Sequence, residues 1–139
     1  MIVGTNAKFG LPEVKIGAIP GDGGTQRLPL LVGKSRAMQM ILSGEPISAE
    51  EAGQNGVVSE VVDPSMTVST AVTLASLIAK RPAKAIELAK EAVRRSTRSI
   101  LQAGLLMERE LVVEVFRTHD REEGHRAFVE KRAPQFRHD

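Results

Sequence analysis

The chain contains no cysteine, tryptophan or tyrosine, and its only aromatic residues are four phenylalanines among 139 residues. Without cysteine the protein has no disulfide and no thiolate metal site, which is compatible with a reducing compartment. Without large aromatic rings the hydrophobic core must consist of Leu, Ile, Val, Ala and Met side chains. This composition favours packed helices.

Long apolar runs and a strong charge of one sign are also absent. No segment approaches the roughly twenty apolar residues that a membrane helix needs, and the N-terminus lacks the basic region of a signal peptide. We therefore expect a soluble protein that does not enter a membrane. Nineteen basic and seventeen acidic residues give a net charge of +2, which does not demand a polyanionic partner.

Two features argue against metal and nucleic-acid binding. Of the three histidines, His119, His125 and His138, only the first two can share a helix face, so no metal site is expected. Residues 80–98 carry seven basic and two acidic side chains. They have no interleaved aromatic residues, so this stretch is expected to be a solvated helix face, and nucleic acid is not an expected partner.

The apolar spacing predicts a mainly α fold with two short β segments, within residues 8–16 and 57–62. Helices are expected over residues 25–33 and 34–42, and after Ser48, which forms a capping box with Glu51. Helical stripes dominate from residue 63 onward; one of them comprises Leu101, Leu105, Val112 and Val115. A final helix should begin at residues 118–120 and end before Pro134. We expect a single domain over residues 1–139.

A single carboxylate, Glu13, stands shortly before a glycine-rich turn, Pro20-Gly21-Asp22-Gly23-Gly24, which opens a helix. Taken alone, Glu13 would be a solvated loop carboxylate, and the turn would be a simple chain reversal. The turn is not a phosphate-binding loop of the Walker type, because no Lys and Ser or Thr follow its last glycine. We expect Asp22 to cap the helix or face solvent; the alternative is a second charge beside Glu13.

The segment from Phe9 to Leu28 resembles the second catalytic segment of the crotonase superfamily, the enoyl-CoA hydratases and isomerases. The ending from Gly124 to Phe136 resembles the closing helix of the same superfamily. In those enzymes a long N-terminal portion comes first, so the resemblance implies the C-terminal half of a crotonase-like fold, a ββα spiral with a helical C-terminal region. Residues 1–62 would end the crotonase core, and residues 63–139 would be a helical oligomerisation region that forms a trimer or hexamer.

The resemblance also implies the site. Glu13 would exchange a proton with the carbon next to the thioester carbonyl of an acyl-CoA substrate, and the Gly21 N–H would hold the reacting water. Pro20, Phe128 and Lys131 would bind substrate, with Phe128 beside the acyl chain and Lys131 at a CoA phosphate. Without the family, Phe128 would be a core aromatic and Lys131 a helix-terminal cation. No cofactor is implied beyond the coenzyme A of the substrate.

Two questions stay open at the level of sequence. The resemblance does not separate hydratase from isomerase, because the second catalytic glutamate of hydratases lies in the N-terminal portion. The alternative to an enzyme is a non-catalytic helical assembly fragment that lacks the oxyanion-hole half. An intracellular location is expected, in the cytoplasm or the mitochondrial matrix.

Overall fold

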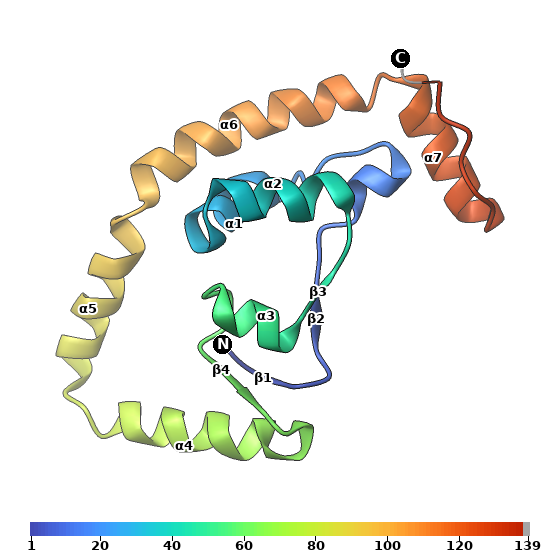
Figure 1. Cartoon of the computed structure of the whole chain (residues 1–139). Coiled ribbons are helices and arrows are strands. Elements are labelled where there is room, and N and C mark those ends of the chain that lie inside the picture. Colours follow the sequence, from blue (N-terminus) through green and yellow to red (C-terminus); the bar gives the residue numbers. More distant parts are fainter. Residues whose placement is uncertain (138–139) are drawn as a thin grey trace. The chain divides into compact units, whose positions relative to one another are not determined.

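The computed structural model of the chain describes residues 1–137, without the side chains of residues 98 and 99 (Figure 1). These residues form two compact units, each assembled from two stretches of sequence. The first unit comprises residues 1–8 and 48–103, and the second comprises residues 9–47 and 104 onward. The predicted division between residues 62 and 63 does not separate these units, since each unit takes residues from both sides of it. The single domain and the roles expected for its two parts stay predictions.

The described part of the chain is mainly helical, as predicted, with only short strands and 3-10 helices between the helices. The α-helices are α1 (Gly24–Val32), α2 (Lys34–Ser43), α3 (Ala49–Gln54), α4 (Thr67–Ala79), α5 (Ala83–Arg95), α6 (Arg98–Val115) and α7 (His119–Glu130). The strands are β1 (Ile2–Gly4), β2 (Lys8–Phe9), β3 (Ile47–Ser48) and β4 (Glu60–Val62), and the 3-10 helices are η1 (Glu13–Ile16) and η2 (Pro64–Met66).

The prediction of two β segments is wrong in number. Strands β2 and β4 lie within the expected segments, but β1 and β3 were not expected. Strands of two or three residues form because a distant segment pairs with them, and they leave little periodic signal of their own. Strand β1 pairs in parallel with β4, so that Ile2 lies opposite Glu60, while β2 pairs with β3.

In the first unit, α3 follows a side-chain cap at Ser48. The Ser48 hydroxyl accepts a 3.1 Å hydrogen bond from the Glu51 N–H, which confirms the predicted helix start. The buried side chains of this unit are small: Ala49, Ala52 and Val58. Neither α4 nor α5 contains a buried residue.

In the second unit, α1 packs against α2. The side chains of Leu28, Ala37 and Met40 are buried there. Helix α2 ends at Gly44, which adopts a left-handed φ of 65° and donates its N–H to the Met40 carbonyl. The helix expected over residues 34–42 is therefore present and is one residue longer than expected.

Of the range 8–16, in which a short β segment was expected, only residues 8 and 9 form a strand, and the segment from Glu13 to Ile16 does not continue it. The segment forms η1, in which the Lys15 N–H donates to the Pro12 carbonyl and the Ala18 N–H donates to the Glu13 carbonyl. Gly17 ends the turn with a left-handed φ of 66°. The local alternation of Val, Lys and Ile is overridden because proline before the turn and glycine after it favour chain reversal.

Candidate active site

Glu13 is the first residue of η1, and its side chain is half-buried. Among the described residues, its Oε2 atom is buried and has no hydrogen-bond partner. Buried carboxylate oxygens are nearly always hydrogen-bonded, because an unsatisfied acceptor is destabilising. An oxygen left without a partner in the folded chain is therefore a candidate for contact with a substrate or a transferred proton.

Helix α7 holds η1 in place by direct contact between the two backbones. A Cβ atom added at Gly17 would lie 2.5 Å from the Asp120 carbonyl oxygen and 2.9 Å from the Arg121 Cα. A Cβ atom at Gly124 would lie 2.8 Å from the Ile16 Cα, and closer still to the Ile16 carbonyl carbon and oxygen. Only glycine at both positions permits this approach, so these two glycines fix where Glu13 begins its turn.

Pro20 and Gly21 lie in the turn that precedes α1. Pro20 is among the largest fully buried side chains. Gly21 is exposed, and a Cβ atom there would lie 2.8 Å from Cγ2 of Val112 on α6. The buried side chain of Pro20 therefore anchors the turn, whereas Gly21 is exposed to solvent.

Glu108, on α6, is a residue of this region that the sequence reasoning missed. Its side chain is only 1% exposed. Its Oε1 accepts a 2.6 Å hydrogen bond from the Gly23 N–H, and its Oε2 accepts a 3.0 Å bond from the Thr25 N–H and a short bond from the Thr25 hydroxyl. The available signal was its position, because Glu108 falls three residues after Leu105 and four before Val112 on the apolar stripe of α6.

Asp22 does not cap α1, so that part of the prediction is wrong. The residue before the helix is Gly23, in a left-handed conformation with φ of 85° and without a side-chain cap. Asp22 is exposed, as the alternative within the same prediction stated, and its carbonyl accepts a short hydrogen bond from the Arg27 guanidinium. The carboxylate that serves the start of α1 comes from Glu108 instead.

Phe128 and Lys131 lie at the C-terminal end of α7, the helix that packs against η1. Phe128 is 70% exposed, so it is not a core aromatic. Lys131 is exposed and is the residue that ends the helix, with a left-handed φ of 54°. Its position at the helix end is as expected, although the helix already ends at Glu130, earlier than the expected end just before Pro134.

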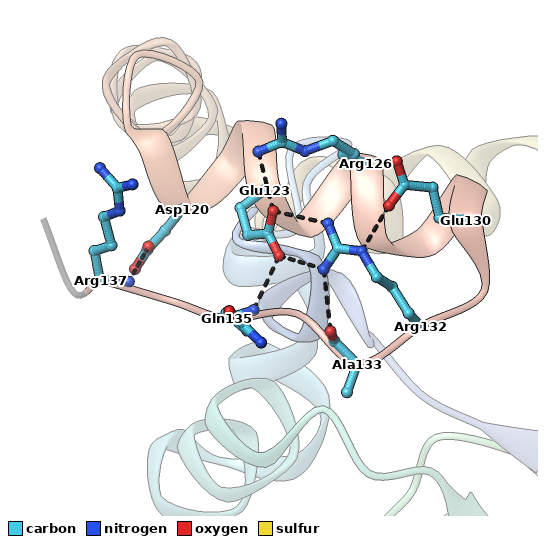
Figure 2. A network of polar contacts seen from close by, with 8 residues as sticks. All are labelled: Asp120, Glu123, Arg126, Glu130, Arg132, Ala133, Gln135 and Arg137. Atoms are coloured by element: carbon cyan, nitrogen blue, oxygen red, sulfur yellow. Dashed lines mark hydrogen bonds and ion pairs between the residues drawn. The ribbon is translucent and has the colours of Figure 1, made fainter.

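A network of ion pairs ties the segment after α7 back onto the helix (Figure 2). The Arg132 guanidinium donates to both carboxylate oxygens of Glu123, at 2.5 and 3.0 Å, and to Glu130 at 2.6 Å. The Gln135 N–H also donates to Glu123, at 3.0 Å. These bonds, the Arg132 side chain first, lower the pKa of Glu123 from 4.5 to about 2.

A hollow of about 550 Å³ borders this network, and charged side chains from α7 and the segment after it line most of it. None of the five predicted site residues lines that hollow. Four of its charged side chains, those of Glu123, Arg126, Glu130 and Arg132, already pair with one another, so we do not assign the substrate to it.

The remaining sequence expectations concern metal, nucleic acid and membrane. Among the described residues, no group of three or more His, Asp or Glu side chains is suited to a metal ion; His138 lies outside these residues. In the basic stretch of residues 80–98, Lys84 pairs with Glu87 and Arg95 with Glu91, as on a solvated helix face. The side chain of Arg98 is not among those that the structure describes. None of the helices in the described part of the chain has the length and apolar character that crossing a membrane requires.

Comparison with known proteins gives a consistent match. The model of the enoyl-CoA hydratase/isomerase family matches residues 1–139. The chain is 48% identical over 137 residues to the 2,3-dehydroadipyl-CoA hydratase of Escherichia coli (strain K12), covering 99% of this chain and 54% of that protein. It is 44% identical over 134 residues to the mitochondrial enoyl-CoA hydratase of Pongo abelii, covering 96% of this chain and 46% of that protein. The crystal structure of carnitinyl-CoA hydratase from Mycobacterium avium superposes with a TM-score of 0.89 at 31% identity, covering 99% of this chain and 54% of that chain.

The chain thus spans about half the length of the relatives it matches. The similarity confirms the coarser fold prediction, a mainly helical chain with short strands that resembles enoyl-CoA hydratases of the crotonase fold. The comparisons do not support the narrower expectation that the matched half is the C-terminal one.

Proposed function

Because the chain belongs to the enoyl-CoA hydratase/isomerase family, we propose that it supplies the proton-transferring carboxylate of an acyl-CoA enzyme, and that this carboxylate is Glu13. The observation that carries the proposal is the buried Glu13 Oε2, which has no hydrogen-bond partner among the described residues. A carboxylate that exchanges a proton with carbon must keep one oxygen available to the substrate.

The chemistry follows from the conjugation of the double bond with the thioester. In hydration, the water oxygen bonds to the β-carbon, and the proton from Glu13 bonds to the carbon next to the thioester carbonyl. The proton released by water then restores the acid form of Glu13. In isomerisation, the same group removes a proton from the carbon next to the carbonyl and returns it to the γ-carbon. Both reactions balance without an added oxidant or reductant, so no cofactor is required beyond the coenzyme A of the substrate.

The other site residues have supporting roles in this proposal. Gly21 is an exposed residue whose backbone N–H orients the reacting water or the substrate, and the buried Pro20 supports the turn. The exposed ring of Phe128 lies beside the acyl chain, and the Lys131 ammonium meets a phosphate of coenzyme A as a flexible point charge.

Hydration of a short 2-enoyl-CoA tests the proposal, followed by loss of absorbance of the conjugated thioester. Glu13→Gln keeps the size of the side chain and removes its acid, so turnover should fall by about a hundredfold to ten-thousandfold. The matched control is Glu45→Gln, which removes an exposed carboxylate that pairs with Lys15 in the same unit and should leave turnover within about twofold. A folded chain without turnover would contradict the proposal and favour the non-catalytic assembly fragment.

A second property, self-association, is supported by the apolar surface of the first unit. Helices α4 and α5 have no buried residue, and Leu77 and Leu88 are 50% and 57% exposed. Exposed apolar patches of this kind usually mark an interaction surface. We propose a homo-oligomer, a trimer or hexamer, and light scattering across a range of concentrations tests it. A monomer at every concentration would contradict this proposal.

The location also stays a proposal. The relatives include a mitochondrial protein and a bacterial one, so both the matrix and the cytoplasm remain the predicted compartments. Fractionation of cells that express the whole protein would distinguish them.

A further inference from the structure

Helix α1 begins without a cap of its own. Its N-cap is Gly23, which has no side chain, and its first turn contains no acidic residue. The first N–H groups of a helix have no partner within the helix, and the helix dipole places partial positive charge there. The start of α1 therefore requires an acceptor, preferably an anion, from another part of the chain.

Glu108 supplies that anion from α6. Its two oxygens together accept three hydrogen bonds, from the N–H groups of Gly23 and Thr25 and from the Thr25 hydroxyl. The residue is buried, with an exposed fraction of 1%. Burying a carboxylate is unfavourable unless its acceptor sites are filled, and an apolar side chain would have suited the same stripe of α6. The carboxylate therefore contributes a specified turn geometry that an apolar residue would not.

Two neighbours of Glu108 on the same face of α6 fit against the same turn. A Cβ atom at Gly23 would lie 3.0 Å from Cδ2 of Leu105, and one at Gly21 would lie 2.8 Å from Cγ2 of Val112. Leu105, Glu108 and Val112 follow one another at helical spacing. One face of α6 thus sets the position of the turn from Gly21 to Thr25.

We propose that Glu108 is a positioning residue, whose carboxylate holds the turn so that the Gly21 N–H is fixed for the reaction that Glu13 performs. The inference rests on the proposed function for its catalytic part. In this proposal Glu108 acts through its hydrogen bonds to Gly23 and Thr25 and does not exchange a proton with substrate.

The first test is amide hydrogen exchange by NMR on the whole chain. Glu108→Gln keeps the size of the side chain but replaces one acceptor oxygen with an NH₂ donor. Exchange at the Gly23 and Thr25 N–H groups should accelerate by about tenfold or more, while the Leu28 N–H within α1 should be unaffected. The matched control is Glu110→Gln, which changes an exposed carboxylate two residues further along α6 and should leave exchange unchanged.

A second pair of variants keeps the test informative if Glu108→Gln does not fold. Thr25→Val removes the hydroxyl bond and retains both N–H bonds, so it should accelerate exchange less than Glu108→Gln. Thr25→Ser retains the hydroxyl and should restore the exchange rates of the unaltered chain. Equal exchange in Thr25→Val and Thr25→Ser would overturn the role of the hydroxyl bond. Unchanged exchange in Glu108→Gln would overturn the anchoring of the turn.

The second test is the kinetics of 2-enoyl-CoA hydration. Glu108→Gln should lower kcat by about tenfold or more and change KM by less than about twofold, because the turn loses its alignment in the transition state. Normal kcat in Glu108→Gln, with an active unaltered chain, would overturn this inference alone. Absence of turnover in the unaltered chain would instead overturn the proposed function and the catalytic part of this inference with it, while the exchange rates would still decide the anchoring.

Discussion

Replacement of Gly124 by alanine tests the contact between α7 and η1 more directly than any other single change. Gly124 is buried in the middle of α7. A Cβ atom there would meet the backbone of Ile16, at 2.8 Å from its Cα and still closer to its carbonyl group. Backbone atoms cannot rotate aside as the end of a side chain can, so α7 would have to move away from η1.

Two effects of opposite sign determine how much Gly124→Ala changes the free energy of unfolding. Alanine is favoured over glycine within a helix by roughly 0.5–1 kcal/mol. Overpacking against a fixed neighbour destabilises by about 1–3 kcal/mol. We therefore expect Gly124→Ala to lower the free energy of unfolding by about 1–2 kcal/mol.

Gly104 on α6 provides a matched control. The three atoms nearest to a Cβ atom at Gly104 would all belong to the flexible side chain of Gln26, which can rotate away. Gly104→Ala should therefore gain the helical preference without the overpacking, and raise the free energy of unfolding by about 0.5–1 kcal/mol. The two variants make the same chemical change in a helix, and opposite signs are expected.

The assay is urea unfolding followed by far-UV circular dichroism, since the chain has no tryptophan or tyrosine for intrinsic fluorescence. The midpoints of Gly124→Ala and Gly104→Ala should fall on opposite sides of that of the unaltered chain, with equal slopes. A Gly124→Ala variant as stable as the unaltered chain would refute the close backbone approach. It would also remove the reason for placing Glu13 by way of α7.

Three further outcomes are expected. The pKa of Glu123 is lowered from 4.5 to about 2, chiefly by Arg132, so the stability from this ion pair should be complete above pH 4.5 and disappear as the pH falls toward 2. The rate of amide exchange at residue 135, followed as a function of pH, measures this loss. A Glu123→Gln variant with the same pH profile as the unaltered chain would contradict the prediction. Lys131→Gly should raise the free energy of unfolding by about 0.5–1 kcal/mol, because the residue has a left-handed φ of 54°. The same change should weaken acyl-CoA binding measured by calorimetry. An affinity equal to that of the unaltered chain would argue against the phosphate contact. Gly21→Ala should lower hydration activity by about tenfold or more, since its Cβ atom would lie 2.8 Å from Val112. A second change, Val112→Ala, should restore part of that activity. A double variant no more active than Gly21→Ala would exclude this steric cause.

Local features of the fold were predictable because the residues that form them are neighbours in sequence. The Ser48 cap involves a hydroxyl and an N–H three residues apart, and the starts of α1, α2 and α7 were predicted to within a residue or two. The spacing of apolar residues indicated the buried face of α2 less accurately. Helical spacing places Met38 and Leu42 on the same face as Ala37, but they are 49% and 65% exposed, whereas Met40 is buried, because the helix packed against α2 decides which side faces inward.

Contacts between distant residues were not predictable. Strand β1 exists because residues about 58 positions further along pair with it. Glu108 was overlooked because its partners, Gly23 and Thr25, lie 85 and 83 residues earlier in the chain. For the same reason Asp22, the nearer carboxylate, was assigned a capping role that the tertiary structure gives to Glu108.

The sequence by itself predicted the mainly helical fold from local spacing, and its resemblance to the crotonase superfamily indicated the family and made Glu13 and Gly21 candidates. The tertiary structure decided which groups surround them. It alone showed that two glycines bring α7 against η1, that Glu108 holds the turn before α1, and that the Glu13 Oε2 is buried without a partner among the described residues. The physical reason is that burial, close backbone approach and hydrogen bonding across the chain depend on positions in space, and sequence separation does not encode them.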